Sequence, residues 1–152
     1  MKIEIMAVGK LRDKHYRALF TEYFGRLGHY LPCANTEIKA SRQSGLEALA
    51  DEAQTFRART KTHTIRVAMD ERGPPRTSTE LAEICQEWML RGTRNVAFYI
   101  GSAEGLDATF RGECDLVLSL STMTLPHEMA RVLLAEQLYR AQTIIRGEPY
   151  HK

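Results

Sequence analysis

Short apolar segments alternate along this chain with longer stretches of helical periodicity. The apolar segments, expected to be strands, are KIEIMAV (2–8), the weaker ANTEIK (34–39), HTIRVAM (63–69), NVAFYIG (95–101) and DLVLSLS (115–121). Strands separated by helices pair in parallel, because each helical crossover returns the chain to the same end of the sheet. The alternation therefore predicts an α/β fold with a mostly parallel sheet and helices on both of its faces.

Helical segments are expected between and after these strands. They cover residues 13–27 behind Asp13 as N-cap, 44–60, 78–92 with Ser78 or Thr79 as N-cap, a short stretch near 107–111, and about 127–145 after Pro126. A chain of 152 residues without repeats or a linker has the size of one domain, so a single domain over 1–152 is predicted.

Charge, hydropathy and cysteine content exclude several classes of protein. No apolar run approaches the roughly 18 residues of a membrane-spanning helix, and MKIEIMAVGK at the start does not resemble a signal peptide. A cytoplasmic location is expected. Cys33, Cys85 and Cys114 show no CxxC spacing, which favours reduced, mostly buried thiols over a metal site or disulfides.

A net charge of +2 neither requires nor excludes a nucleic-acid partner, but the basic residues are clustered. One cluster comprises Lys10, Arg12, Lys14 and Arg17, and a second comprises Arg57, Arg59, Lys61 and Arg66. Such clusters can contact phosphates. The alternative is an ordinary solvated surface.

Three loops are the first candidates for a ligand site, because ligands of parallel α/β sheets bind beyond the carboxyl ends of the strands. These loops are MDERG (69–73), IGSAEG (100–105) and STMTLPH (121–127). Gly101 and Gly105 allow backbone to approach a ligand closely, although a tight structural turn explains them equally. The hydroxyls and apolar side chains that alternate after residue 118 suit a flat heterocycle such as adenine, or else an N-capping loop.

The last expected helix carries both polar and apolar signals. His127 and Arg131 share one face, and Glu136 and Arg140 form an i, i+4 pair. Apolar residues lie on two faces of the helix, which predicts burial on two sides and favours a homodimer. The chain then ends in GEPYHK (147–152), an unusually stiff and aromatic sequence for a terminus.

Three stretches together carry a resemblance to a known family. They are MKIEIMAVGKLRDKHY (1–16), FYIGSAEGL (98–106) and LSLSTMTLPHEMARVLLAEQLYRAQTIIRGEPYHK (118–152). The chain resembles the RlmH family, small SPOUT-class methyltransferases that methylate N3 of a pseudouridine in bacterial 23S rRNA. The likeness runs the length of the chain and is weakest across 40–62. It implies a C-terminal trefoil knot, S-adenosylmethionine bound in that knot, and homodimers with each active site near the interface.

The resemblance also implies positions for the cofactor contacts. They are Met69, Gly101, Leu120, Ser121, Thr122, Met123, Thr124 and Leu125. Two positions depart from the family pattern: Met69 stands where Leu is common, and Ser102 stands where the family usually has a second glycine. The backbone at Ser102 must then avoid a glycine-only conformation, or its hydroxyl adds a polar group near the cofactor.

Methylation of N3 requires alignment of donor and nucleophile and loss of the N3 proton. The candidate catalytic residues are His127, Arg131, Tyr150 and His151, with Glu136 and Arg140 as weaker candidates. We expect His127 and Arg131 to position the base, and Tyr150 and His151 to close over substrate and cofactor. Alternatively, the tail seals the dimer interface.

Recognition of 23S rRNA within the ribosome must come from the dimer surface, because the chain has no room for a separate RNA-binding domain. Lys10, Arg12, Lys14 and Arg17 are the candidates for phosphate contacts. Two other functions stay open: a non-catalytic RNA- or ribosome-binding dimer, suggested by Ser102, and a SPOUT methyltransferase that acts on tRNA.

Overall fold

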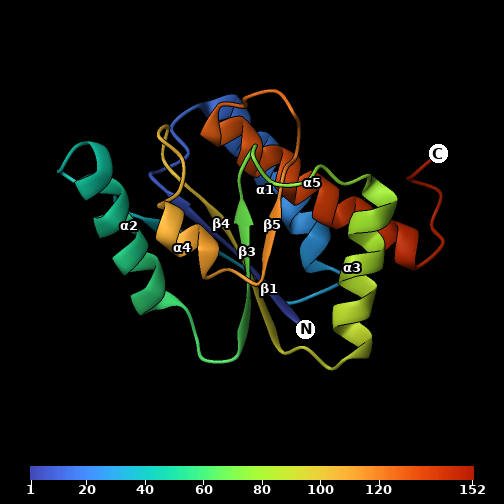
Figure 1. Ribbon diagram of the computed structural model, residues 1–152. Helices are drawn as coiled ribbons and strands as arrows, with labels where there is room; N and C mark the ends of the chain where they lie inside the picture. Colours follow the sequence, from blue (N-terminus) through green and yellow to red (C-terminus); the bar gives the residue numbers. More distant parts are fainter.

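Five parallel strands form one sheet in the computed structural model, which describes residues 1–152 (Figure 1). The elements are β1 (Lys2–Val8), α1 (Lys14–Gly28), β2 (Cys33–Ile38), α2 (Gly45–Arg59), β3 (Thr64–Met69), α3 (Ser78–Leu90), β4 (Asn95–Ile100), α4 (Ala108–Gly112), β5 (Leu116–Leu118) and α5 (His127–Ile145). The strand order is β2-β1-β4-β3-β5, and every neighbouring pair is parallel. The predicted α/β class and the parallel sheet are confirmed.

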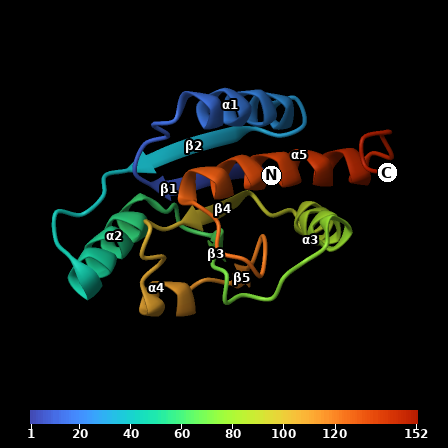
Figure 2. The ribbon, with the colours of Figure 1, turned by 90° about the horizontal axis from the view of Figure 1, so that it is seen from above.

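Helices cover both faces of the sheet, because successive side chains of each strand point to opposite sides. Ile3 and Ile5 of β1 belong to the larger core, together with apolar residues of α1, α3 and α5. Met6 and Val8 belong to a smaller core with α2 and α4. Figure 2 shows α1, α3 and α5 on one side of the sheet and α2 and α4 on the other.

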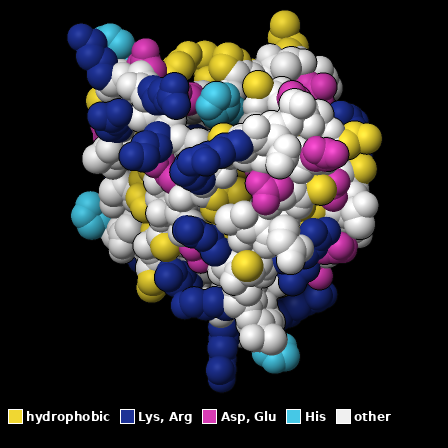
Figure 3. Space-filling model, turned by 90° about the vertical axis from the view of Figure 1, so that its left-hand side faces the viewer, with side chains coloured by type: hydrophobic (Ala, Val, Ile, Leu, Met, Phe, Trp, Pro, Cys, Tyr) yellow, Lys and Arg dark blue, Asp and Glu magenta, His cyan; other side chains and the backbone are white.

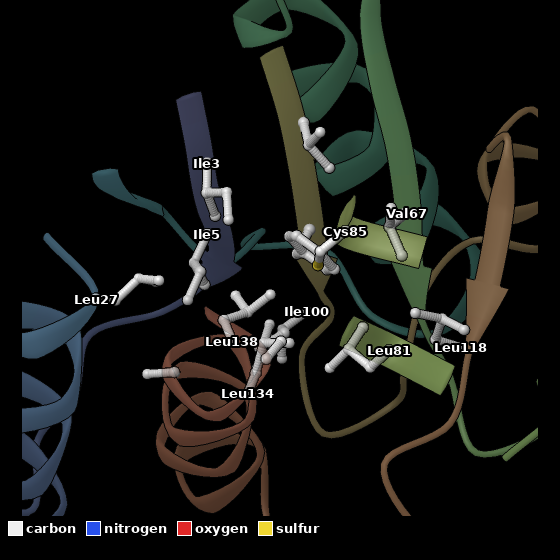
Figure 4. Close-up of a cluster of buried hydrophobic side chains, with 14 of the residues drawn as sticks. Ile3, Ile5, Leu27, Val67, Leu81, Cys85, Ile100, Leu118, Leu134 and Leu138 are labelled. Atoms are coloured by element: carbon white, nitrogen blue, oxygen red, sulfur yellow. The ribbon is translucent and has the colours of Figure 1, made fainter. Parts of the chain in front are cut away.

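Helix α5 is buried on two sides within a single chain. Its Leu134 and Leu138 are directed toward the sheet, where Figure 4 shows them beside Ile100. Tyr139, on another side, packs its ring 6.3 Å from that of Tyr23. The helix thus lies between the sheet, α1 and α3. The two apolar faces that favoured a homodimer are therefore explained by intramolecular packing, and a dimer requires a different argument.

Two predicted boundaries were wrong. The N-cap of α3 is Thr77, not Ser78 or Thr79: its hydroxyl accepts from the Glu80 N–H at 3.2 Å, and the Glu80 carboxylate accepts from the Thr77 N–H at 2.7 Å. This reciprocal pair is a capping box. Strand β5 ends at Leu118, because the next residue turns to a loop partner, with Ser119 N–H donating to Pro74 C=O at 3.3 Å.

The loop after β5 crosses the loop between β3 and α3 before the chain returns as α5. Pro75 and Ser119 form a parallel bridge, and the Thr124 hydroxyl donates to the Glu71 carboxylate at 2.6 Å. A C-terminal trefoil knot, implied by the family resemblance, would involve this crossing and stays a prediction. None of the helices combines the length and apolar composition needed to cross a membrane.

Replacement of Thr77 by Ala tests the capping box. We expect Thr77→Ala to lower the free energy of unfolding by about 1 kcal/mol, because the N-terminal N–H groups of α3 lose their acceptor. Thr79→Ala is the matched control, since Thr79 is exposed within the helix, and should change stability by less than about 0.5 kcal/mol. Urea denaturation measures both, and equal losses in the two variants would contradict the assignment of the cap.

Candidate functional site

A cleft of about 630 Å³ lies at the carboxyl ends of β3, β4 and β5. It is lined by residues 69–72 after β3, residues 100–105 at the end of β4, and residues 119–121 and 123–127 after β5, with Ala130 from the second turn of α5. The three loops selected from the sequence therefore meet at one edge of the sheet. This volume lies within the range of about 300–1,000 Å³ that is common for small-molecule sites.

The turn after β4 is closed so tightly that only glycine fits at position 101. A Cβ atom on Gly101 would lie 2.0 Å from the carbonyl oxygen of Gly105. The Gly105 N–H donates to the Ser102 carbonyl at 3.0 Å, and Gly105 adopts a φ of +89°. Ser102 itself has a negative φ, so a serine fits without backbone strain. The expectation that the backbone at Ser102 avoids a glycine-only conformation is confirmed. Ser102 also lines the cleft, and a contact of its hydroxyl with the cofactor stays a prediction.

Hydrogen bonds within the segment after β5 fix the wall opposite this turn. The Ser119 hydroxyl donates to the Ser121 carbonyl at 2.6 Å, and the Met123 N–H donates to the Ser121 hydroxyl at 2.9 Å. Leu120 packs against the larger core from this segment. Of the residues predicted to contact a cofactor, all line the cleft except Thr122, which is exposed outside it. Apolar side chains beside backbone polar groups suit a nucleoside.

A buried ion pair, which sequence reasoning missed, supports the loop after β3. The Asp70 side chain is only 6% exposed and accepts from Arg111 of α4 at 2.8 Å. Asp70 also accepts from the Arg72 N–H at 2.9 Å. The carboxylate is thus occupied by structural contacts, although it borders the cleft. The order of residues gave no signal for the pair, because Asp70 and Arg111 are 41 positions apart.

His127 enters the cleft from the first position of α5, where the preceding Pro126 sets the start of the helix. Glu128, the next residue, accepts from the backbone N–H groups of Arg12 and Asp13, both at 3.1 Å. The first basic cluster therefore begins beside the cleft. Among its members, the Arg17 guanidinium donates to the Leu11 carbonyl at 2.7 Å. Lys10, Arg12 and Lys14 are exposed and their side chains form no ion pair.

Arg131 does not reach the cleft, in contrast to the expectation that it positions a base there. Its side chain is 0% exposed and forms an ion pair with Glu37 of β2 at 2.9 Å. It also donates to the Val8 carbonyl at 3.1 Å and to that of Gly9. The guanidinium is thus directed toward the turn between β1 and α1. The two side chains lie on the same side of α5, but Arg131 is about 6 Å farther along the helix from the cleft.

The remaining catalytic candidates form a separate cluster between the C-terminal half of α5 and the tail. The Glu136 carboxylate accepts from Arg140 at 2.6 Å and from the Tyr150 hydroxyl at 3.0 Å, and Arg140 lies 3.4 Å from His151 Nδ1. With 1.5 Å per residue, Arg140 lies about 20 Å along the helix from His127. In Figure 1 the C-terminus lies at the opposite end of α5 from the three loops. Within one chain, the tail therefore does not close over the cleft.

Tyr150 is suited to donate a hydrogen bond and not to act as a base. Burial and the hydrogen bond to Glu136 both raise the pKa of Tyr150 above its ordinary value. The ring also packs 4.7 Å from Tyr139, and the Arg140 guanidinium lies over it at 4.7 Å. The phenol is therefore neutral at physiological pH.

Arg57 and Arg66 of the second basic cluster form structural ion pairs, and the three cysteines are free thiols. Arg57 forms two hydrogen bonds with Glu113, at 2.9 and 2.8 Å, and Arg66 approaches the same carboxylate. Burial raises the pKa of Cys33 and Cys114 to about 11 and that of Cys85 to about 12, so the free thiols stay protonated. No group of three His, Cys, Asp or Glu side chains is arranged to hold a metal ion.

Comparison with known proteins identifies relatives over the whole length of the chain. A family model described as "Predicted SPOUT methyltransferase" matches residues 1–151. A curated protein of Chromobacterium violaceum, "Ribosomal RNA large subunit methyltransferase H", is 41% identical over 156 residues and covers 100% of this chain and 99% of its own. The protein of the same name from Paraburkholderia phymatum is 43% identical, with the same coverage.

A solved structure gives the same fold at lower sequence identity. The crystal structure of a probable methyltransferase from Bordetella pertussis Tohama I superposes with a TM-score of 0.60 at 17% identity, and covers 92% of this chain and 93% of its own. At this identity the similarity concerns the fold alone.

Gly101 provides a test of the cleft. Gly101→Ala places a methyl group against the Gly105 carbonyl, so we expect a loss of stability of about 1–3 kcal/mol and at least about tenfold weaker binding of S-adenosylmethionine, the expected cofactor. The control is Gly25→Ala in α1, where a Cβ meets nothing within 4 Å, and which should stabilise the helix by up to about 1 kcal/mol. Calorimetry measures binding; unchanged affinity in folded Gly101→Ala would show that this turn does not hold the cofactor.

Proposed function

We propose that this chain, which belongs to the SPOUT methyltransferase family, methylates N3 of a pseudouridine in 23S rRNA within the ribosome. Its general activity follows from the family: the chain is an S-adenosylmethionine-dependent rRNA methyltransferase. The finer substrate rests on one observation, the full-length similarity to curated large-subunit rRNA methyltransferases, which includes the C-terminal residues. A ribosomal substrate also implies a cytoplasmic location.

The residues of the cleft fit S-adenosylmethionine. Gly101 lacks the Cβ that would collide with the Gly105 carbonyl, so the backbone of this turn closes tightly where it lines the cleft. Met69, Ile100 and Leu120 supply apolar surface for an adenine ring, while Ser102 and Ser121 supply hydroxyls. When bound, the cofactor supplies an electrophilic methyl group on a positively charged sulfur. The chain itself aligns this group with the base, which is where catalysis of such a displacement gains most.

His127 is the catalytic candidate that the geometry favours for the N3 proton. It is the only one of the six candidates that lines the cleft in its own subunit. Methyl transfer forms the N3–C bond and breaks the S–C bond, so the sulfur becomes a neutral thioether and N3 must lose its proton. A neutral imidazole beside N3 accepts that proton. Arg131 holds the helix that carries His127 and does not contact the base.

A homodimer brings the tail of one subunit to the cleft of the other. On one side of α5, Ala130 and Gln137 are partly buried and Leu133 is 37% exposed. Leu133 borders a second hollow of about 270 Å³ beside α3. If a two-fold axis passes near Leu133 and perpendicular to α5, the two α5 helices run antiparallel. The His127 end of one then faces the Tyr150 end of the other. In this arrangement, Tyr150 donates to or stacks on the base, and His151 lies beside it.

No observation supports either of the two alternative functions. Ser102, which suggested a non-catalytic binding dimer, has ordinary backbone geometry and lines the cleft. A tRNA substrate has no support in the names of the curated relatives, which refer to large-subunit rRNA.

The substrate is tested with labelled S-adenosylmethionine and ribosomes from a strain that lacks the modification. We expect label in 23S rRNA at N3 of one pseudouridine, located by mass mapping. His127→Ala should reduce the rate by about 100-fold or more, whereas His29→Ala, at the end of α1 and exposed, should have little effect. Label in tRNA or on another base would contradict the proposed substrate.

Mixing two inactive variants tests the trans arrangement, in which the tail of one subunit acts at the cleft of the other. Subunits with His127→Ala and subunits that lack residues 147–152 are refolded together. If the tail acts on the partner's cleft, half of the sites in each mixed dimer are complete, and random association restores about a quarter of the wild-type activity. If the tail acts on its own cleft, no site contains both elements. Activity of the mixture at the level of the separate variants would contradict the trans arrangement.

A further inference from the structure

We propose that Arg131, Glu37 and Glu128 are positioning residues that brace the loop 9–13 against α5, and thereby hold Lys10 and Arg12 at the mouth of the cleft for contact with rRNA phosphates. This inference rests on the proposed function, since it assigns part of the recognition of the same substrate. It concerns residues that do not contact the reacting atoms. Their effect is on the geometry of the RNA-binding loop relative to His127.

The first contact of the brace is made by Arg131 from inside the protein. Its guanidinium binds the Val8 carbonyl, the Gly9 carbonyl and the Glu37 carboxylate. The same Glu37 oxygen accepts from the Leu11 N–H at 3.0 Å. Gly9 has a φ of +79°, so the chain turns sharply at this point. One buried cation thus fixes both ends of the turn that leads out of β1.

The second contact is made by Glu128 from the first turn of α5. Its carboxylate accepts from the consecutive N–H groups of Arg12 and Asp13. Asp13 in turn caps α1, accepting from His15 and Tyr16 at 2.7 and 3.0 Å. The short loop is therefore bound along its length to β2, α1 and α5. Surface loops are usually much less constrained.

The two cationic side chains of this loop, in contrast, form no bonds within the chain. Lys10 and Arg12 are exposed, and neither side chain forms a hydrogen bond or an ion pair within the chain, whereas Arg17 binds two backbone carbonyls of the same loop. The backbone that carries these cations is bonded to Glu128, the residue next to His127. Figure 3 shows, from one side, how Lys and Arg side chains gather on the surface more densely than acidic ones in its upper left part. Because the backbone that carries these cations is held in place, the loop loses less conformational entropy on binding than a mobile loop would.

Fold stability alone does not account for Arg131. Burial of a guanidinium is costly even when it is paired, and apolar side chains of similar size often stabilise a core as well or better. The Nε of Arg131 is also buried without a hydrogen-bond partner, which adds to this cost. A buried charged group can instead restrict the neighbouring chain to one conformation among several. Here it defines the position of a loop that must meet a large polyanion.

The main test removes the external contact, because Glu128 can be changed without opening the core. Glu128→Ala removes a negative charge, so long-range electrostatics alone predicts tighter binding of RNA. The brace predicts the opposite: about tenfold weaker binding to ribosomes that lack the modification, since two N–H groups lose a charged acceptor. The KM for ribosomes should rise by the same factor, whereas kcat and the affinity for S-adenosylmethionine should change by less than about twofold.

Two matched variants separate the brace from other effects of Glu128. Glu128→Gln lacks the charge that favours a helix N-terminus but keeps an acceptor oxygen, so it should restore binding to within about threefold of wild type. Glu83→Ala removes an exposed acid on α3 and should bind as tightly as wild type or more tightly. Wild-type or tighter binding by Glu128→Ala, or equal weakening in Glu128→Gln, would overturn the proposal.

A double-mutant cycle tests whether the brace acts through the cations. Replacement of both Lys10 and Arg12 by Ala should weaken binding by about tenfold in the wild-type background, but by only about threefold with Glu128→Ala, because the cations there are already misplaced. Equal factors in both backgrounds would overturn the link. If wild-type protein binds ribosomes but transfers no methyl group to pseudouridine, the proposed function fails while the brace is still measured. If wild-type protein does not bind ribosomes, both fail.

Discussion

The parallel pairing of β3 with β4 and with β5 is the constraint on which the rest of the structure depends. Parallel strands place their carboxyl ends at one edge, so the loops that follow them meet whatever their separation in sequence. Met69 pairs with Ile100 and with Leu118, and each of these residues lies at the end of its strand. The three loops that line the cleft begin from this single row of paired residues.

The close contact between Gly101 and Gly105 shapes one wall of the cleft that the three loops line. The tight turn keeps the chain after β4 compact, so space is left between it and the segment after β5. The Thr124–Glu71 hydrogen bond and the Asp70–Arg111 ion pair fix the other two loops. Because each wall is held by contacts within the chain, the site is largely formed before any ligand binds.

Features that depend on local periodicity could be predicted from the sequence, whereas features that depend on distant contacts could not. The strands, the helices and the three loops follow from the apolar pattern and from one rule about parallel sheets. The N-cap at Thr77 was also readable, since Thr77 and Glu80 have the spacing of a capping box, but three consecutive hydroxyl residues obscured it. In contrast, Arg131 lies 94 positions from Glu37, and only the folded chain shows that it points away from His127.

Helix α5 connects the cleft, the loop 9–13 and the C-terminal tail as one rigid element. Its first turn carries His127 in the cleft, and its second carries Arg131 next to the loop 9–13. Its C-terminal half holds the tail through Glu136 and Arg140. A helix fixes the distances between such groups, since its rise and rotation per residue are constant. Burial between the sheet, α1 and α3 also prevents the helix from tilting independently. Helix α5 can therefore keep the cleft, the loop 9–13 and the tail in a fixed mutual geometry.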